Sequence, residues 1–149
     1  MTLTDAANRY RYAFEQLTPD SLDDLVALAA SDIVFTDPFN TVHGKDGFRH
    51  VFAHMFATCQ NPRFVVSDMA MGADAVYLRW TMTGQIIGYS SLSLHLDGIS
   101  EVHFNKDGLV TKHIDHWDSA SQLLNQLPYI GWLIRRILRL FRLKTAKTS

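Results

Sequence analysis

The sequence predicts an α+β fold in which a curved, cone-shaped antiparallel sheet packs on N-terminal helices, followed by a C-terminal amphipathic helix. Apolar residues recur at steps of three and four in residues 5–17, 22–29 and 48–56, which is the helical period. From Pro62 onward they alternate with polar residues in four stretches separated by turn-forming residues. The 149 residues, 47% hydrophobic and 19% charged, are enough for one domain with its own core. We expect that domain at residues 1–127, with a basic helix and tail at 128–149.

Two helices are expected before the first strand. The first spans Asp5 to Leu17, and the second begins after the break at residues 18–21. Residues Ile33 to Phe39 alternate and are expected to form a strand, and residues 41–47 are expected to form a loop.

A third helix and four further strands complete the predicted domain. The helix carries an apolar stripe between Phe48 and Phe56 and ends at Asn61-Pro62. The strands are expected at residues 64–66, 75–87, 92–104 and 109–117. Residues 105–108, Asn-Lys-Asp-Gly, are a strong hairpin turn. A sheet of this kind curls over helices on one face and leaves a pocket inside.

The composition limits the compartment and the partners. The single Cys59 cannot close an intramolecular disulfide, and neither a secretory signal nor an apolar run of about 18 residues is visible, so we expect a cytoplasmic protein. Residues 1–127 carry a net charge of −7, which disfavours nucleic acid as a partner. His50 and His54 could share a helix face, but two ligands do not make a zinc site, so no metal and no cofactor is expected.

Asp37 is a candidate general base. By alternation it shares a strand face with Ile33, Phe35 and Phe39, so its carboxylate is expected to point inward. Burial disfavours the charged form of a carboxylate and therefore makes it a better proton acceptor. The alternative is that Asp37 ends the strand and caps the turn at Asn40.

The later strands place further polar residues on apolar faces. Ser100 lies in an apolar row, with Gly98 as an expected bulge or bend, and its hydroxyl could donate to a ligand oxygen or satisfy a backbone group. Trp80 belongs to a second apolar row. His113 and Asp115 share one face of the last strand and could orient a proton donor or a water molecule. The alternative for this pair is a surface ion pair on an exposed sheet face.

Three segments carry a resemblance to a known family. They are Ala-Ser-Asp-Ile-Val-Phe-Thr-Asp-Pro-Phe at residues 30–39, His-Gly-Lys-Asp at residues 43–46, and the stretch from Asp107 to Asp118. Together they resemble the nuclear-transport-factor-2-like superfamily, in particular its branch of ketosteroid isomerases and SnoaL-like polyketide cyclases. The resemblance spans approximately residues 5–118. It implies the cone-shaped fold, whose members include isomerases, cyclases, dehydratases and pure binding modules.

The resemblance also assigns roles to residues. It places Asp37 at the position of the general base and Trp117 at an aromatic residue of the pocket wall. The family's oxyanion hole, a tyrosine on the first helix and a protonated aspartic acid on a late strand, corresponds to Ala13 and Ser100, with Tyr12 one residue away.

We therefore expect a homodimer that binds a small apolar molecule and acts on it as an isomerase, cyclase or dehydratase without a cofactor. The expected catalytic residues are Asp37, His113 and Asp115, and the expected ligand contacts are Tyr12, Trp80, Ser100 and Trp117. The alternative is a noncatalytic module for ligand binding or dimeric assembly.

Residues 129–143 predict a basic amphipathic helix. Its apolar residues fall within about 160° of a helical wheel, with four arginines on the opposite side. Such a helix can lie on an anionic membrane surface or cover an apolar groove on protein. We favour packing against protein, because the rest of the chain is acidic.

Overall fold

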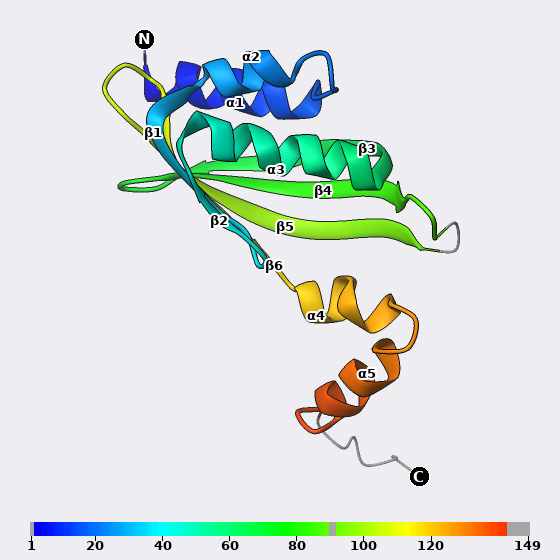
Figure 1. Cartoon of the computed structure of the whole chain (residues 1–149). Helices are drawn as coiled ribbons and strands as arrows, with labels where there is room; N and C mark the ends of the chain where they lie inside the picture. The colour runs from blue at the N-terminus through cyan, green and yellow to red at the C-terminus, as the bar shows by residue number, and fades with distance from the viewer. Residues whose placement is uncertain (1, 90–91, 143–149) are drawn as a thin grey trace. The chain divides into compact units, whose positions relative to one another are not determined.

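The computed structural model describes residues 2–89 and 92–142, which belong to two compact units (Figure 1). The first unit ends at Trp117 and the second begins at Asp118. The predicted domain boundary at residue 127 stays a prediction, and residue 143, the expected end of the tail helix, lies outside the described residues. The first unit contains, in order, α1 (Leu3–Glu15), α2 (Leu22–Ala27), β1 (Ala29–Thr36), β2 (Thr41–His43), α3 (Gly44–Thr58), β3 (Cys59–Met71), β4 (Val76–Ile86), β5 (Ser93–Phe104) and β6 (Val110–Trp117).

The strands form one curved, six-stranded sheet in the order β2-β1-β6-β5-β4-β3, and the predicted α+β class is confirmed. Helices α1, α2 and α3 lie on one side of this sheet (Figure 1). Neighbouring strands are antiparallel except β1 and β6, which run parallel. The first strand of the unit is therefore bonded to its last one.

Helix α1 begins with a capping box and buries its apolar face. The Thr2 hydroxyl accepts a hydrogen bond from the Asp5 backbone N–H, and the Asp5 carboxylate accepts one from the Thr2 backbone N–H. This capping box satisfies backbone donors that the first turn leaves open. Tyr10 and Phe14, four residues apart, then lie on the buried face of the helix.

Several element boundaries differ from the sequence-based expectation. Strand β1 begins and ends earlier than expected, and residues 41–43 form β2 instead of a loop because they pair with β1 across a tight turn. Helix α3 ends at Thr58, before Asn61-Pro62. Those two residues lie within β3, where the pairing register with β4 shifts and Asn61 has a φ of 50°. Proline has no N–H for the ladder, so an irregular position on an edge strand accommodates it.

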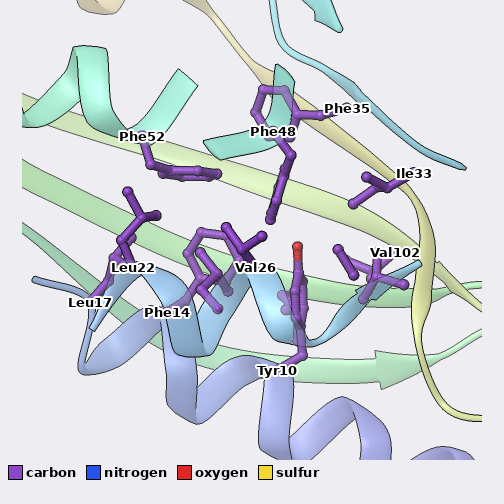
Figure 2. Packing of buried hydrophobic residues seen from close by; sticks show 14 of the residues in the cluster. Tyr10, Phe14, Leu17, Leu22, Val26, Ile33, Phe35, Phe48, Phe52 and Val102 are labelled. Atoms are coloured by element: carbon purple, nitrogen blue, oxygen red, sulfur yellow. The ribbon is translucent and has the colours of Figure 1, made fainter. Parts of the chain in front are cut away.

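The hydrophobic core lies between the helices and the sheet. Figure 2 shows the Tyr10 ring among apolar side chains from helices and strands, with its hydroxyl group directed into the cluster. Phe14, Phe48 and Phe52 contribute aromatic rings that meet edge to face. Burial of a large side chain contributes about 1.5–3 kcal/mol, so this cluster positions the inward face of the sheet firmly.

The second unit consists of short helical segments. They are α4 (Ser119–Gln122), the 3-10 helix η1 (Leu124–Gln126) and α5 (Gly131–Arg139). The helix expected at residues 129–143 begins later, at Gly131. Tyr129 has a φ of 68°, which is incompatible with a helix. Gly131 is buried where an added Cβ would lie 2.4 Å from the Asn125 carbonyl oxygen, and Arg135 donates to that same oxygen. Among the residues that the structure describes, no helix has the length and apolar character needed to cross a bilayer.

Candidate functional site

A chain of five hydrogen-bonded side chains runs through the interior of the first unit. The Tyr10 hydroxyl lies 2.8 Å from His113 Nδ1, and His113 Nε2 lies 2.8 Å from Asp115 Oδ1. The Ser100 hydroxyl donates to the same Asp115 oxygen at 2.5 Å, and Trp80 Nε1 donates to Ser100 Oγ at 2.8 Å. Tyr10, His113, Ser100 and Trp80 are all buried, and Asp115 is partly exposed. His113 and Asp115 therefore lie on the inward side of β6 and not on an exposed sheet face.

With a neutral His113 imidazole, every hydrogen bond of this network has one direction. Burial, followed by the nearby negative charge of Asp115, raises the pKa of the Tyr10 hydroxyl well above its ordinary value, so the phenol stays protonated. The phenol then donates to His113 Nδ1, which requires the imidazole proton on Nε2. That proton is donated to Asp115 Oδ1. The carboxylate of Asp115 is thus the acceptor at which both arms of the chain end.

Strand register explains why these residues meet. Ser100 and Asp115 are directly opposite each other across β5 and β6, and directly opposed side chains on one face of a sheet lie close together. Trp80 on β4 is opposite Gly98, and its indole extends over Gly98 toward Ser100. Of the bulge or bend expected at Gly98, the bulge is wrong, because the register with β4 continues through this position and Gly98 also pairs with Trp117 on β6. Glycine is needed here because the indole occupies the space of a side chain.

We expect Gly98→Ala to lower the free energy of unfolding by about 1–3 kcal/mol, the usual cost of overpacking a filled core. An added Cβ would lie 2.4 Å from the nearest ring carbon of Trp80, so the indole must move and its bond to Ser100 must stretch. Urea denaturation measures the change. In a Trp80→Leu background the same substitution should cost less than in the wild type. An equal cost in both backgrounds would show that the indole is not what the alanine meets.

Asp115, Ser100 and Trp80 line a small cavity whose other walls are apolar. The remaining lining residues are Phe14, Phe52, Phe64, Val66 and Leu78. The space open to a water molecule is about 20 Å³, which holds one water and is too small for a ring-shaped ligand. The cavity is therefore an aromatic-walled space with a carboxylate in its wall, and it is nearly filled by the protein's own side chains.

Asp37 lies outside the residues that line this cavity. Strand β1 ends at Thr36, so the alternation no longer applies, and Phe39, expected in the buried row, is 55% exposed. Asp37 Oδ1 accepts hydrogen bonds from the backbone N–H groups of Phe39 at 2.7 Å and Asn40 at 2.6 Å. The carboxylate is placed as in the turn-capping alternative, because it holds the turn that leads into β2.

We expect Asp37→Ala to lower the free energy of unfolding by about 1 kcal/mol, because it removes the acceptor for two backbone N–H groups. Asp37→Asn keeps an acceptor oxygen at the same place and should stay within about 0.5 kcal/mol of the wild type. Chemical denaturation of both variants makes the comparison. Equal losses in the two variants would contradict the turn-capping role.

Two of the expected ligand contacts lie elsewhere on the molecule. Tyr12 is 64% exposed and its expected place in the pocket is wrong, because it lies on the outer side of α1. The tyrosine of the site is Tyr10, which follows the apolar stripe of that helix. Trp117 is half-buried at the end of β6, and its ring centroid lies 5.7 Å from that of Phe39. It does not line the cavity beside Asp115.

The polar side chains of this site do not form a metal centre. Within residues 2–89 and 92–142, no three His, Cys, Asp or Glu side chains are grouped closely enough to hold an ion. His50 and His54 lie on α3, and both are exposed.

Comparison with known proteins identifies related sequences and folds. A family model described as a SnoaL-like domain matches residues 10–113, which include Tyr10, Ser100 and His113. None of the curated proteins compared with the chain matches it in sequence. Several solved structures share the fold at low sequence identity, which relates their architecture and not their activities.

One of these structures is a hypothetical protein with a ketosteroid isomerase-like fold from Catenulispora acidiphila, in complex with trimethylamine. It has a TM-score of 0.68 at 18% identity, covering 82% of this chain and 92% of that one. A putative isomerase from Bacillus subtilis has a TM-score of 0.67 at 17% identity, and the match covers 79% of this chain and 90% of that one. A Mycobacterium tuberculosis protein in complex with estradiol-17beta-hemisuccinate has a TM-score of 0.62 at 16% identity, and the match covers 78% of this chain and 93% of that one.

Proposed function

Because the chain belongs to the SnoaL-like domain family, we propose that it binds a small, largely apolar molecule between the sheet and helices α1 and α3. We further propose that Asp115 removes a proton from that molecule. The reaction class is an isomerisation, cyclisation or elimination that begins with loss of a proton. Complexes of two fold relatives with small molecules, trimethylamine in one and estradiol-17beta-hemisuccinate in the other, support the binding part of the proposal.

The observation that carries the proposal is the position of the Asp115 carboxylate. Oδ1 accepts from both His113 and Ser100, which holds the carboxylate in one orientation. Oδ2 has no hydrogen-bond partner among the described residues and is the oxygen that can accept a proton. The walls beside it are aromatic and aliphatic, so an apolar ligand held there would lie directly against the carboxylate.

Tyr10, His113 and Ser100 act as positioning residues in this proposal. None of them can take the proton from the ligand, because Tyr10 and Ser100 are donors in the chain and both ring nitrogens of His113 are engaged. When Asp115 Oδ2 gains a proton, the two donors on Oδ1 keep the carboxyl group in place for the return of that proton. A base that returns its proton to another atom of the ligand catalyses an isomerisation.

The test uses a model carbon acid, 5-nitrobenzisoxazole, because the natural ligand is not needed to detect a base. Loss of its ring C–H proton to the base breaks the N–O bond and gives a coloured cyanophenolate. The wild type, Asp115→Asn and Asp37→Asn are compared at equal concentration. Acceleration that disappears in Asp115→Asn and persists in Asp37→Asn supports the proposal. The reverse pattern would assign the base to Asp37, as the family resemblance implies.

A noncatalytic ligand-binding module is the second candidate, and the small-molecule complexes of two fold relatives support it as well as they support the first. For this role the protein should bind apolar molecules and give no acceleration in any variant. The homodimer, the cytoplasmic location and the attachment of residues 129–143 to a membrane surface stay predictions from the sequence.

A further inference from the structure

The Trp80 indole fills the place beside Asp115 into which a ligand would fit. Its ring lies over Gly98, where two of its carbons are within 2.6 Å of the position of an added Cβ. The ring of Phe64 meets it edge to face at a centroid distance of 6.0 Å. Trp80 is the largest side chain among the residues that line the 20 Å³ space.

The contacts of the indole are ones that a ligand can replace. The indole ring is flat, it lies on a glycine that presents no side chain, and its single donor, Nε1–H, bonds to Ser100. A planar ligand of similar size would make the same ring contacts after the side chain rotates away. The ligand would bind only the conformation in which the Trp80 side chain has rotated away. Its binding free energy would then offset the cost of moving the indole.

The hydrogen-bond acceptors in the cavity wall determine which polar groups such a ligand must carry. Three lining residues carry polar side-chain atoms, and the remaining five are apolar. The Ser100 proton is committed to Asp115, so Ser100 Oγ can only accept from whatever replaces the indole N–H. The free Asp115 oxygen is also an acceptor. A ligand in this place must therefore bring hydrogen-bond donors, since a buried acceptor without a partner costs about 1–3 kcal/mol.

We propose that Trp80 closes the site in the free protein and is displaced by a flat, fused-ring ligand that carries a hydroxyl or N–H donor, which takes over the bond to Ser100. This inference rests on the proposed ligand site beside Asp115, and it names the class of molecule bound there. It concerns binding and does not depend on whether Asp115 acts as a base.

The experiment follows the Trp80 indole N–H of the full chain by ¹H–¹⁵N NMR, assigned by its loss in Trp80→Phe. The probe is 2-naphthol, and 2-methoxynaphthalene is the matched compound that keeps the two rings and lacks the donor. We expect saturating 2-naphthol to shift the Trp80 signal and to increase its exchange with water at least 10-fold. We expect 2-methoxynaphthalene to bind at least 10-fold more weakly, a ratio worth about 1.4 kcal/mol.

A variant provides a second measurement. Trp80→Ala leaves the place of the indole empty, so it should bind 2-naphthol at least 10-fold more tightly than the wild type. Trp117→Phe, at the rim of the sheet, should bind like the wild type.

Three results would overturn the inference. They are a Trp80 N–H that stays protected when 2-naphthol is bound, equal affinity for the two naphthalenes, and no binding of 2-naphthol to the wild type at millimolar concentration. Loss of acceleration in Asp115→Asn with an unmoved Trp80 would leave the proposed base in place and remove only this inference.

Discussion

The Asp115→Asn variant should lose about 10²–10⁴-fold of the acceleration that the protein gives to 5-nitrobenzisoxazole, the usual contribution of a positioned general base. Asparagine has nearly the same shape, and its amide oxygen can still accept from His113 and Ser100. The amide cannot take a proton from carbon. The loss should therefore appear in the rate at saturating substrate, with little change in the concentration needed for half-saturation.

Two controls separate the base from its surroundings. Ser100→Ala removes one of the two donors on Asp115 Oδ1 and keeps the base, so it should lose less than Asp115→Asn. Asp37→Asn should retain the wild-type rate, because Asp37 does not line the cavity. A rate in Asp115→Asn equal to that of the wild type would remove Asp115 from the mechanism.

The His113→Phe variant should lose about 2–4 kcal/mol of its free energy of unfolding, measured by urea denaturation. Phenylalanine fills most of the space of the imidazole, which packs against Phe14 and Phe35. It leaves the Tyr10 hydroxyl without an acceptor and removes one of the donors to Asp115. Each buried polar group left without its partner costs about 1–3 kcal/mol.

A double-mutant cycle tests the cause of this loss. Tyr10→Phe should be costly in the wild type and nearly neutral in the His113→Phe background, where its hydroxyl has no partner to lose. Independent, additive losses would contradict the direct bond between Tyr10 and His113.

The sequence predicted the fold well because alternation and helical spacing are local signals. The strands from residue 76 to 117 and the turn at Asn105–Gly108 follow that pattern closely, and the backbone bond from Gly108 to Asn105 closes the turn. The same signals placed His113, Asp115 and Ser100 on inward faces. Local signals could not show that all three side chains belong to one hydrogen-bonded network, because their contacts depend on the register between separate strands.

The errors arose where a local pattern ends. Asp37 follows the last residue of β1, and a carboxylate beside free backbone N–H groups binds them instead of continuing the alternation. Tyr12 lies one residue from the position that the family resemblance assigns to a tyrosine, whereas Tyr10 follows the apolar stripe of α1. The indole over Gly98 could not be predicted either, because it depends on the distance between neighbouring strands.

The parallel pairing of β1 with β6 has a consequence for the synthesis of the protein. Strand β1 leaves the ribosome early, and its partner is the last strand of the unit to emerge. Until then the β1 backbone has an unpaired edge, and Tyr10 has no imidazole to bind. Long-range pairing of this kind makes folding slow and leaves unfinished chains prone to aggregation. A premature stop before Val110 should therefore yield insoluble material that chaperones must hold, rather than a smaller working domain.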